Sequence, residues 1–246
     1  PLYAHLPLIL SPDRSKMSKR YAETSLLEYR RDGYLPEAMA NFLALIGWHP
    51  KDNQEIFSLI DLVKEFDLKR VQKAGAVMNS QKLDWLNSRY FKEMKTETIL
   101  ERLKPFLEAE KISASEETLK KIIEIERGRM KTLKDFMKSS AFFFKLPDYE
   151  ASLLQWKQEP ITKVKTTLEK TLAVLEEIAP EKFTHPIILK SLSELVGKEG
   201  RGEVFWPLRA ALSGLKASPD PVAIVEALGK EETIRRLKIA LSKLDE

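Results

Sequence analysis

Helical periodicity is the feature of this sequence that most restricts its fold. From Glu23 onward, apolar residues recur three and four positions apart along almost the whole chain, as they do on the buried side of an amphipathic helix. Residues that end helices stand where such stretches stop, with Gly33 and Gly47 as examples. Only residues 2–10, which are short, apolar and bounded by prolines, have the character of an extended segment. The sequence therefore predicts an all-α fold preceded by one short extended segment.

Start and stop signals divide the periodic stretches into a series of expected helices. Pro105 should kink or break the fifth of them, because proline lacks the backbone N–H that a helix interior needs. A break in composition near residues 94–96 and a loop-like stretch at 145–160 mark the expected seams between domains. Helices are expected at 25–32, 36–46, 59–66, 83–90, 96–109, from 115 onward, and at 133–137, 163–178, 186–196, 203–211, 221–228 and 231–244.

Composition excludes several kinds of chemistry. The chain has no cysteine, so it cannot form a disulfide, a thiolate nucleophile or a cysteine-rich zinc site. Its three histidines are scattered, which argues against a histidine-based metal site, and no metal is expected. The chain has only nine glycines and no G-x-G-x-x-G or G-x-x-x-x-G-K-[ST] sequence, so a glycine-rich phosphate loop is also excluded.

Charge and hydropathy indicate which partners and which cellular location to expect. The 41 basic and 37 acidic residues nearly balance, so a net charge of +4 and a pI near 9.0 permit an anionic partner without requiring one. No apolar run approaches the roughly 20 residues of a membrane helix, and the N-terminus lacks the features of a signal peptide. We therefore expect a soluble cytoplasmic protein with no membrane partner. Pro1 in place of an initiator Met suggests a chain cut from a longer one.

A basic loop joins the extended segment to the first expected helix. Four cations fall within seven residues, at positions 14, 16, 19 and 20, interleaved with Ser15 and Ser18. Ammonium groups and hydroxyl donors on a loop can bind a polyphosphate. A solvated basic loop explains the same residues, because most charge runs are solvated surface. Composition alone leaves both interpretations open.

The literal sequence of this loop is more informative than its charge. Lys16-Met17-Ser18-Lys19-Arg20 resembles the Lys-Met-Ser-Lys signature loop of class I aminoacyl-tRNA synthetases, and its setting resembles the glutamyl-tRNA synthetase family. An ordered series of further matches, dense over the first 90 residues and sparse beyond them, makes the resemblance specific. These matches are residues 33–38 (GYLPEA), 41–48 (NFLALIGW), 79–87 (NSQKLDWLN), 133–136 (LKDF) and 207–214 (PLRAALSG).

The resemblance implies that this loop takes part in amino-acid activation. It would hold ATP, with Mg²⁺ in the intact enzyme. Lys19 would contact the phosphates and Lys16 would assist, while the backbone near Met17 would lie beside the adenine and Ser18 and Arg20 would complete the loop. Two ammonium groups there would offset the charge that builds as the α-phosphate is attacked and pyrophosphate leaves.

The first signature of the family, His-x-Gly-His, is absent, because none of the three histidines precedes a glycine–histidine pair. The resemblance thus implies that the catalytic fold that binds glutamate and completes the ATP site lies N-terminal to this chain. Residues 1–22 would be the end of the catalytic domain, and residues 23–94 a helical stem-contact domain. Residues 95–148 and 149–246 would be two subdomains of an all-helical, bacterial-type anticodon-binding region. The chain alone should be a monomer that binds tRNA and is catalytically inactive.

A second basic segment lies at residues 120–145, where eight basic against three acidic residues give a net charge of +5. Arg127, Lys131, Lys134 and Lys138 share one face if a single helix carries them, although Gly128 interrupts the register, so the face is expected from residue 131 onward. Such a face is either solvated surface or a track for RNA phosphates. The family resemblance favours the RNA track.

Unstacked anticodon bases are read by arginine side chains and aromatic planes. By motif position, the resemblance assigns anticodon recognition to Arg129, Arg209 and Ser218. The rings of Phe205 and Trp206, beside Arg209, are either core or a stacking platform. The chain is thus expected to be the tRNA-binding portion of a synthetase that activates glutamate with ATP and transfers it to tRNA. Two alternatives remain: a stand-alone helical RNA-binding or interaction module without catalysis, and a synthetase that charges both glutamate and glutamine tRNAs.

Overall fold

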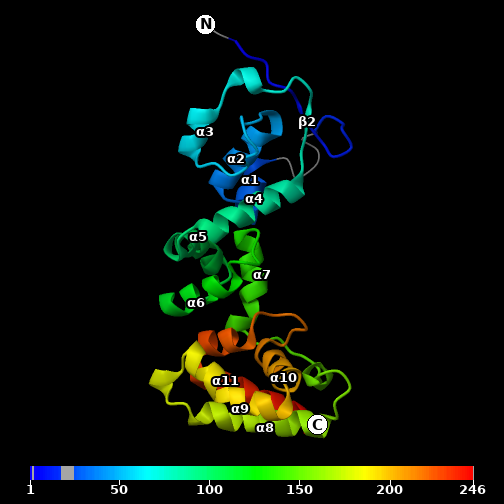
Figure 1. Cartoon of the computed structure of the whole chain (residues 1–246), viewed down its shortest axis with the longest axis vertical. Coiled ribbons are helices and arrows are strands. Elements are labelled where there is room, and N and C mark those ends of the chain that lie inside the picture. Colours follow the sequence, from blue (N-terminus) through cyan, green and yellow to red (C-terminus); the bar gives the residue numbers. More distant parts are fainter. Residues whose placement is uncertain (2, 18–24, 246) are drawn as a thin grey trace. The chain divides into compact units, whose positions relative to one another are not determined.

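A computed structural model of the chain describes residues 1, 3–17 and 25–245. Over these residues the fold is all-α, as the periodicity predicts, with one parallel pairing of two short strands, β1 (Ile9–Leu10) and β2 (Ala76–Val77). None of the helices described is long and apolar enough to cross a membrane. The helices are α1 (Leu26–Asp32), α2 (Pro36–Gly47), α3 (Leu59–Glu65), α4 (Ser80–Glu93), α5 (Thr96–Ala109), α6 (Glu116–Glu126), α7 (Leu133–Phe144), α8 (Ile161–Glu177), α9 (His185–Glu199), α10 (Arg201–Ser213) and α11 (Pro221–Lys243) (Figure 1).

The chain forms two compact units, each assembled from two stretches of sequence. The N-terminal unit is Pro1–Phe106 with Arg127–Met137, and the C-terminal unit is Leu107–Glu126 with Lys138–Glu246. Each unit therefore contains part of the expected 95–148 subdomain. The division into four domains stays a prediction.

Local signals place several helix ends where the sequence predicts them. Ser58 caps α3, with its side-chain oxygen 3.1 Å from the backbone N–H of Asp61. Gly33 ends α1 at a φ of +84°, in the left-handed region that glycine adopts without strain. Gly229 has non-helical torsions inside α11 and divides it into two parts. This break falls in the gap between the helices expected at 221–228 and 231–244.

Two helix predictions need correction. Pro105 does not break α5, because Leu103 and Leu107 on either side of it are buried and their packing holds the helix to Ala109. The basic face expected from residue 131 onward begins later, since α7 starts at Leu133: Lys134 and Lys138 lie in this helix, but Lys131 lies in the turn before it. Thr132 explains the new start, because its side chain accepts from the N–H of Asp135 at 3.1 Å.

Each unit has its own core. In the N-terminal unit α2 packs on α4 around Met39, Phe42, Leu83 and Leu86. Asn41 and Asn87 are buried there and hydrogen-bonded. In the C-terminal unit α8 to α11 gather together (Figure 1), and α6 packs against α11. The fully buried side chains of this second core include Leu168, Ile188, Leu192, Leu208 and Leu237.

Candidate nucleic-acid interface

The start of the signature loop folds back on the strand that precedes it. Ser15 donates twice to the Asp13 carboxylate, from its N–H at 2.9 Å and its hydroxyl at 2.7 Å, and the hydroxyl bond chiefly lowers the pKa of Asp13. Arg14 has a φ of +65°, and Lys16 then forms an antiparallel bridge with Leu10. Lys16 is exposed and Met17 is half-buried. Ser18, Lys19 and Arg20 lie outside the described residues.

The short parallel ladder connects this loop to the helices that follow it in sequence. Ile9 and Leu10 pair with Ala76 and Val77, immediately before the helix that contains the 79–87 match. The N–H of Met78 donates to the carbonyl oxygen of Leu10 at 2.8 Å, and Asn79 caps α4. Lys16 is thereby held within the N-terminal unit through backbone hydrogen bonds that the sequence pattern did not predict.

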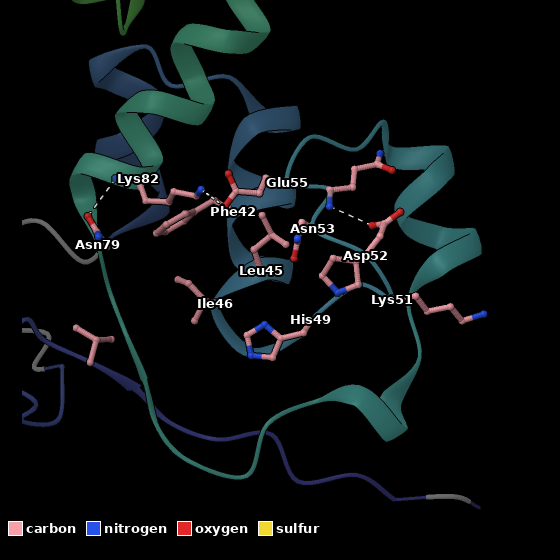
Figure 2. Close-up of a pocket in the computed structure, with 13 residues that line it drawn as sticks. Phe42, Leu45, Ile46, His49, Lys51, Asp52, Asn53, Glu55, Asn79 and Lys82 are labelled. Carbon is pink, nitrogen blue, oxygen red and sulfur yellow. Dashed lines mark hydrogen bonds and ion pairs between the residues drawn. The ribbon is translucent and has the colours of Figure 1, made fainter.

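A cavity of about 870 Å³ lies beside this ladder, between the end of α2, the loop at residues 49–55 and the start of α4. Figure 2 shows Lys82 reaching from α4 toward Glu55, with which it forms an ion pair. Asp52 accepts from the N–H of Gln54 at 3.0 Å, so the loop is ordered by its own side chains. The sequence pattern does not indicate this cavity, because its lining residues come from several segments and are mixed in charge. Among the described residues, no group of three or more carboxylates and histidines is placed to hold a metal ion.

Arg129 lies in the turn between α6 and α7, and the neighbours of this turn fasten it to the N-terminal unit. Met130 is buried, and Asn87 donates its amide to the carbonyl oxygen of Lys131. The N–H of Leu133 donates to the carbonyl oxygen of Gly33 at 3.1 Å. The Arg129 side chain is exposed on this anchored turn. An exposed guanidinium on a fixed backbone has the geometry required to read a base edge.

Lys131 and Lys134 already have acidic partners. The Lys131 ammonium is 3.2 Å from Asp84, and that of Lys134 is 2.7 Å from Asp32. The two lysine side chains are 59% and 53% exposed, so these pairs contribute little to stability, about 0–1 kcal/mol each. The lysines can exchange a carboxylate for a phosphate at small cost. Sequence reasoning missed the carboxylates because they come from α1 and α4, far away along the chain.

Arg209 projects from α10 over a half-buried tryptophan. Its guanidinium carbon lies 4.6 Å from the centre of the Trp206 ring, and Nη2 donates to the carbonyl oxygen of Lys216 at 3.0 Å. Desolvation lowers the pKa of Arg209, which still leaves a permanent cation at neutral pH. Trp206 is fixed in turn, since its indole N–H donates to the carbonyl oxygen of Leu153 at 3.0 Å. Arg209 is thus held with a planar group behind it.

The rings around Arg209 do not form a closed core. Trp206 and Phe205 are both half-buried, and the ring of Trp156 lies 5.2 Å from that of Trp206. Trp156 packs on Gly202, where an added Cβ would come within 2.4 Å of the indole nitrogen. A cation above one of two adjacent indoles is the type of surface on which nucleobases stack. Trp206 was predictable for this platform from its place beside Arg209, whereas Trp156 is 50 residues away from Trp206 along the chain and carries no such signal.

Ser218 lies in the loop between α10 and α11. Its hydroxyl oxygen is buried and has no hydrogen-bond partner among the described residues. The loop starts at Gly214, which has a φ of +64°, and an added Cβ there would come within 2.7 Å of the Pro147 ring, so a side chain has no room. The acceptor of Arg209, the Lys216 carbonyl, belongs to the same loop. The structure therefore groups Arg209 with the Ser218 loop in the C-terminal unit, and Arg129, Lys131 and Lys134 with Lys16 in the N-terminal unit.

Comparisons with known proteins divide the residues differently, because the match to an anticodon binding domain includes Arg129, Lys131 and Lys134 but not Lys16. Residues 1–85 match the family model "tRNA synthetases class I (E and Q), catalytic domain", and residues 98–241 match "Anticodon binding domain". Glutamate–tRNA ligase 2 of Thermoanaerobacter pseudethanolicus is 39% identical over 98% of this chain and 51% of its own length. The glutamate–tRNA ligase of Thermus thermophilus is 37% identical over 98% and 52%.

A solved structure shows the same fold. The crystal structure of a glutamate tRNA ligase from Elizabethkingia meningosepticum in complex with its amino acid has a TM-score of 0.86 and 34% identity, over 99% of this chain and 52% of that one. The chain spans about half the length of the relatives it matches. The chain therefore belongs to the anticodon binding domain family, and its residues 1–85 are similar to part of a class I tRNA synthetase catalytic domain.

Proposed function

We propose that this chain is the tRNA-binding portion of a glutamate–tRNA ligase, which activates glutamate with ATP and transfers it to its cognate tRNA. The observation that carries the proposal is the order of the two family matches, with the catalytic segment at residues 1–85 followed by the anticodon binding domain at 98–241. A stand-alone helical module is not favoured, because the relatives are ligases of about twice this length.

In this proposal Arg209 and Ser218 of the C-terminal unit contact anticodon bases. Arg209 donates to a base edge while Trp206 supports its guanidinium from behind. The Ser218 hydroxyl, which has no hydrogen-bond partner in the described part of the chain, takes a further base contact. Arg129 reads another anticodon base from its exposed turn. Lys131 and Lys134 exchange Asp84 and Asp32 for phosphates.

The signature loop serves the chemical step. Lys16 and Lys19 supply positive charge to the phosphates of ATP, with Met17, Ser18 and Arg20 completing the loop around the nucleotide and Mg²⁺ accompanying it. The charge that develops as glutamate attacks the α-phosphate requires such fixed cations. The chain contains no His-x-Gly-His sequence, so we expect these 246 residues to bind tRNA without aminoacylating it. A cytoplasmic location and a monomeric state belong to the same proposal.

Salt-dependent binding tests the proposal directly. The dissociation constant of the chain for a glutamate tRNA transcript is measured by fluorescence anisotropy at several salt concentrations, beside a glutamine tRNA transcript. Each phosphate contact should add about 0.7–0.9 to the log–log slope. A slope near zero would contradict RNA binding through phosphates. Equal affinity for both transcripts would instead indicate a ligase that charges both tRNAs.

A further inference from the structure

One arginine of α11 is almost completely buried in the C-terminal unit. The side chain of Arg236 is 1% exposed. Its Nη1 donates to the carbonyl oxygens of Phe142 at 2.7 Å and Leu212 at 2.5 Å, and its Nη2 donates to that of Phe143 at 3.1 Å. Its Nε donates to the Glu232 carboxylate at 2.7 Å. Every nitrogen of the guanidinium is therefore hydrogen-bonded.

The three carbonyl groups that accept hydrogen bonds from Arg236 lie at helix ends. Phe142 and Phe143 belong to the last turn of α7, and Leu212 belongs to the last turn of α10. The final carbonyl groups of a helix have no partner within the helix, and the helix dipole makes that end negative. A buried cation there satisfies acceptors that would otherwise be unpaired, and it ties two helix ends to one point of α11. This is a strong constraint on the backbone, because a guanidinium is planar and its donors have fixed directions.

The constrained backbone leads directly into the proposed anticodon site. Leu212 is followed by Ser213 and then by Gly214, which starts the loop of Ser218. Ser213 donates its hydroxyl to the carbonyl oxygen of Arg209 at 2.8 Å, one turn earlier. The segment after α7 packs at the end of α10, since Pro147 lies against Gly214. None of the hydrogen bonds of Arg236 involves the Arg209 side chain, so any influence between them passes through the backbone.

We propose that Arg236 is a positioning residue for anticodon recognition: by holding the carbonyl ends of α10 and α7, it sets the place of Arg209 and of the Ser218 loop. The inference rests on the proposed function, because it concerns how the tRNA is read. It predicts that weakening Arg236 reduces the distinction between anticodons more than it reduces RNA binding as a whole. A purely structural role would weaken binding to every tRNA equally.

The chain offers two matched controls on the same helix. Lys230 also caps a helix end, donating to the carbonyl oxygens of Glu176 and Ile178 at 2.7 Å each, but these belong to the end of α8. Arg235 shares the Glu232 carboxylate at 2.7 Å, and its side chain is 56% exposed. Lys230→Met therefore removes a cap from a helix end other than those that Arg236 holds. Arg235→Lys alters the same ion-pair network without touching the carbonyls.

The test measures the binding of the chain to two labelled transcripts, a glutamate tRNA and the same tRNA with one anticodon base changed. The discrimination ratio is the second dissociation constant divided by the first. We expect Arg236→Lys to reduce this ratio about tenfold, equivalent to about 1.4 kcal/mol at 25 °C. Lys230→Met and Arg235→Lys should leave the ratio unchanged. Arg236→Met should lower the discrimination ratio further. If Arg236→Met does not fold, the ratio of Arg236→Lys tests the proposal.

A double variant separates positioning from stability. If Arg236 acts largely through Arg209, then Arg236→Lys should reduce the discrimination ratio much less in the Arg209→Ala background than in the wild type. Independent, additive losses would overturn the inference, as would an unchanged ratio in Arg236→Lys. A wild-type ratio of one would overturn anticodon reading itself, and the role of Arg236 with it. The two failures are therefore distinguishable.

Discussion

The guanidinium of Arg209 combines a fixed backbone acceptor with an aromatic plane behind it, and this combination makes a direct prediction. Arg209→Lys should raise the dissociation constant for glutamate tRNA about tenfold or more, because lysine loses both the stacked plane and the forked donors. Arg201→Lys is the matched control, since Arg201 also lies over a ring of α10, that of Phe205 at 5.5 Å. Equal losses in both variants, measured by anisotropy, would refute a specific role for Arg209.

The lysine ion pairs predict opposite effects for the two partners of one pair. Lys134→Met should weaken tRNA binding and lower the salt slope by about 0.7–0.9, the value of one phosphate contact. Asp32→Asn should leave binding unchanged or tighten it, because it releases Lys134 from its carboxylate. Neither change should shift the thermal midpoint appreciably, since both partners are about half-exposed. If Asp32→Asn weakens binding as much as Lys134→Met, the lysine does not contact phosphate.

At the scale of a single element, the acid sensitivity of α11 depends on Glu232. Hydrogen bonds from Arg235 and Arg236 lower the pKa of Glu232 from 4.5 to about 2, while partial burial opposes the shift. The stability that this carboxylate contributes is therefore present above pH 4.5 and is lost as the pH falls from 4.5 toward 2. Glu232→Gln should melt lower than wild type at pH 6, and the difference should shrink toward pH 2. A difference that grows as the pH falls would contradict this assignment.

The end of α10 depends on a glycine. Gly214→Ala should destabilise the chain by about 1–3 kcal/mol, because it forces a residue with a side chain to a φ of +64° and against Pro147. Gly197→Ala, inside α9 with open space around it, should stabilise the chain by about 0.5–1 kcal/mol. Urea unfolding of both variants tests the pair, and a neutral Gly214→Ala would show that the loop can adopt another conformation.

The whole molecule is divided in a way that sequence seams do not reveal. Residues 107–126 and 138–246 form one compact unit, and α11 packs on α6 within it. A piece comprising residues 149–246 alone would leave Arg236 without its carbonyl acceptors on Phe142 and Phe143. We expect this piece to melt well below the intact chain, since a buried cation that has lost acceptors is costly. A cooperative transition at the same temperature as the intact chain would support the seam near residue 149 instead.

Much of the site was predictable from sequence because its signals are local or literal. The signature loop and the ordered series of matches assign the family without coordinates. Arg236 had a weaker signal, since it falls with Thr233, Leu237 and Ala240 on the apolar face of its helix. In isolation the sequence Arg235-Arg236 resembles solvated surface charge, and only the acceptors distinguish the two arginines.

The sequence by itself determined the helical class, most helix starts and ends, and the order of the family motifs, because caps, glycines and periodicity act over a few neighbouring residues. The tertiary structure alone decided which segments share a unit, that Asp32 and Asp84 pair with the lysines, and that Arg236 is buried. These outcomes depend on residues far apart in the chain, 94 positions in the case of Arg236 and Phe142. Their free energy comes from packing and desolvation in the assembled core, which no local pattern encodes.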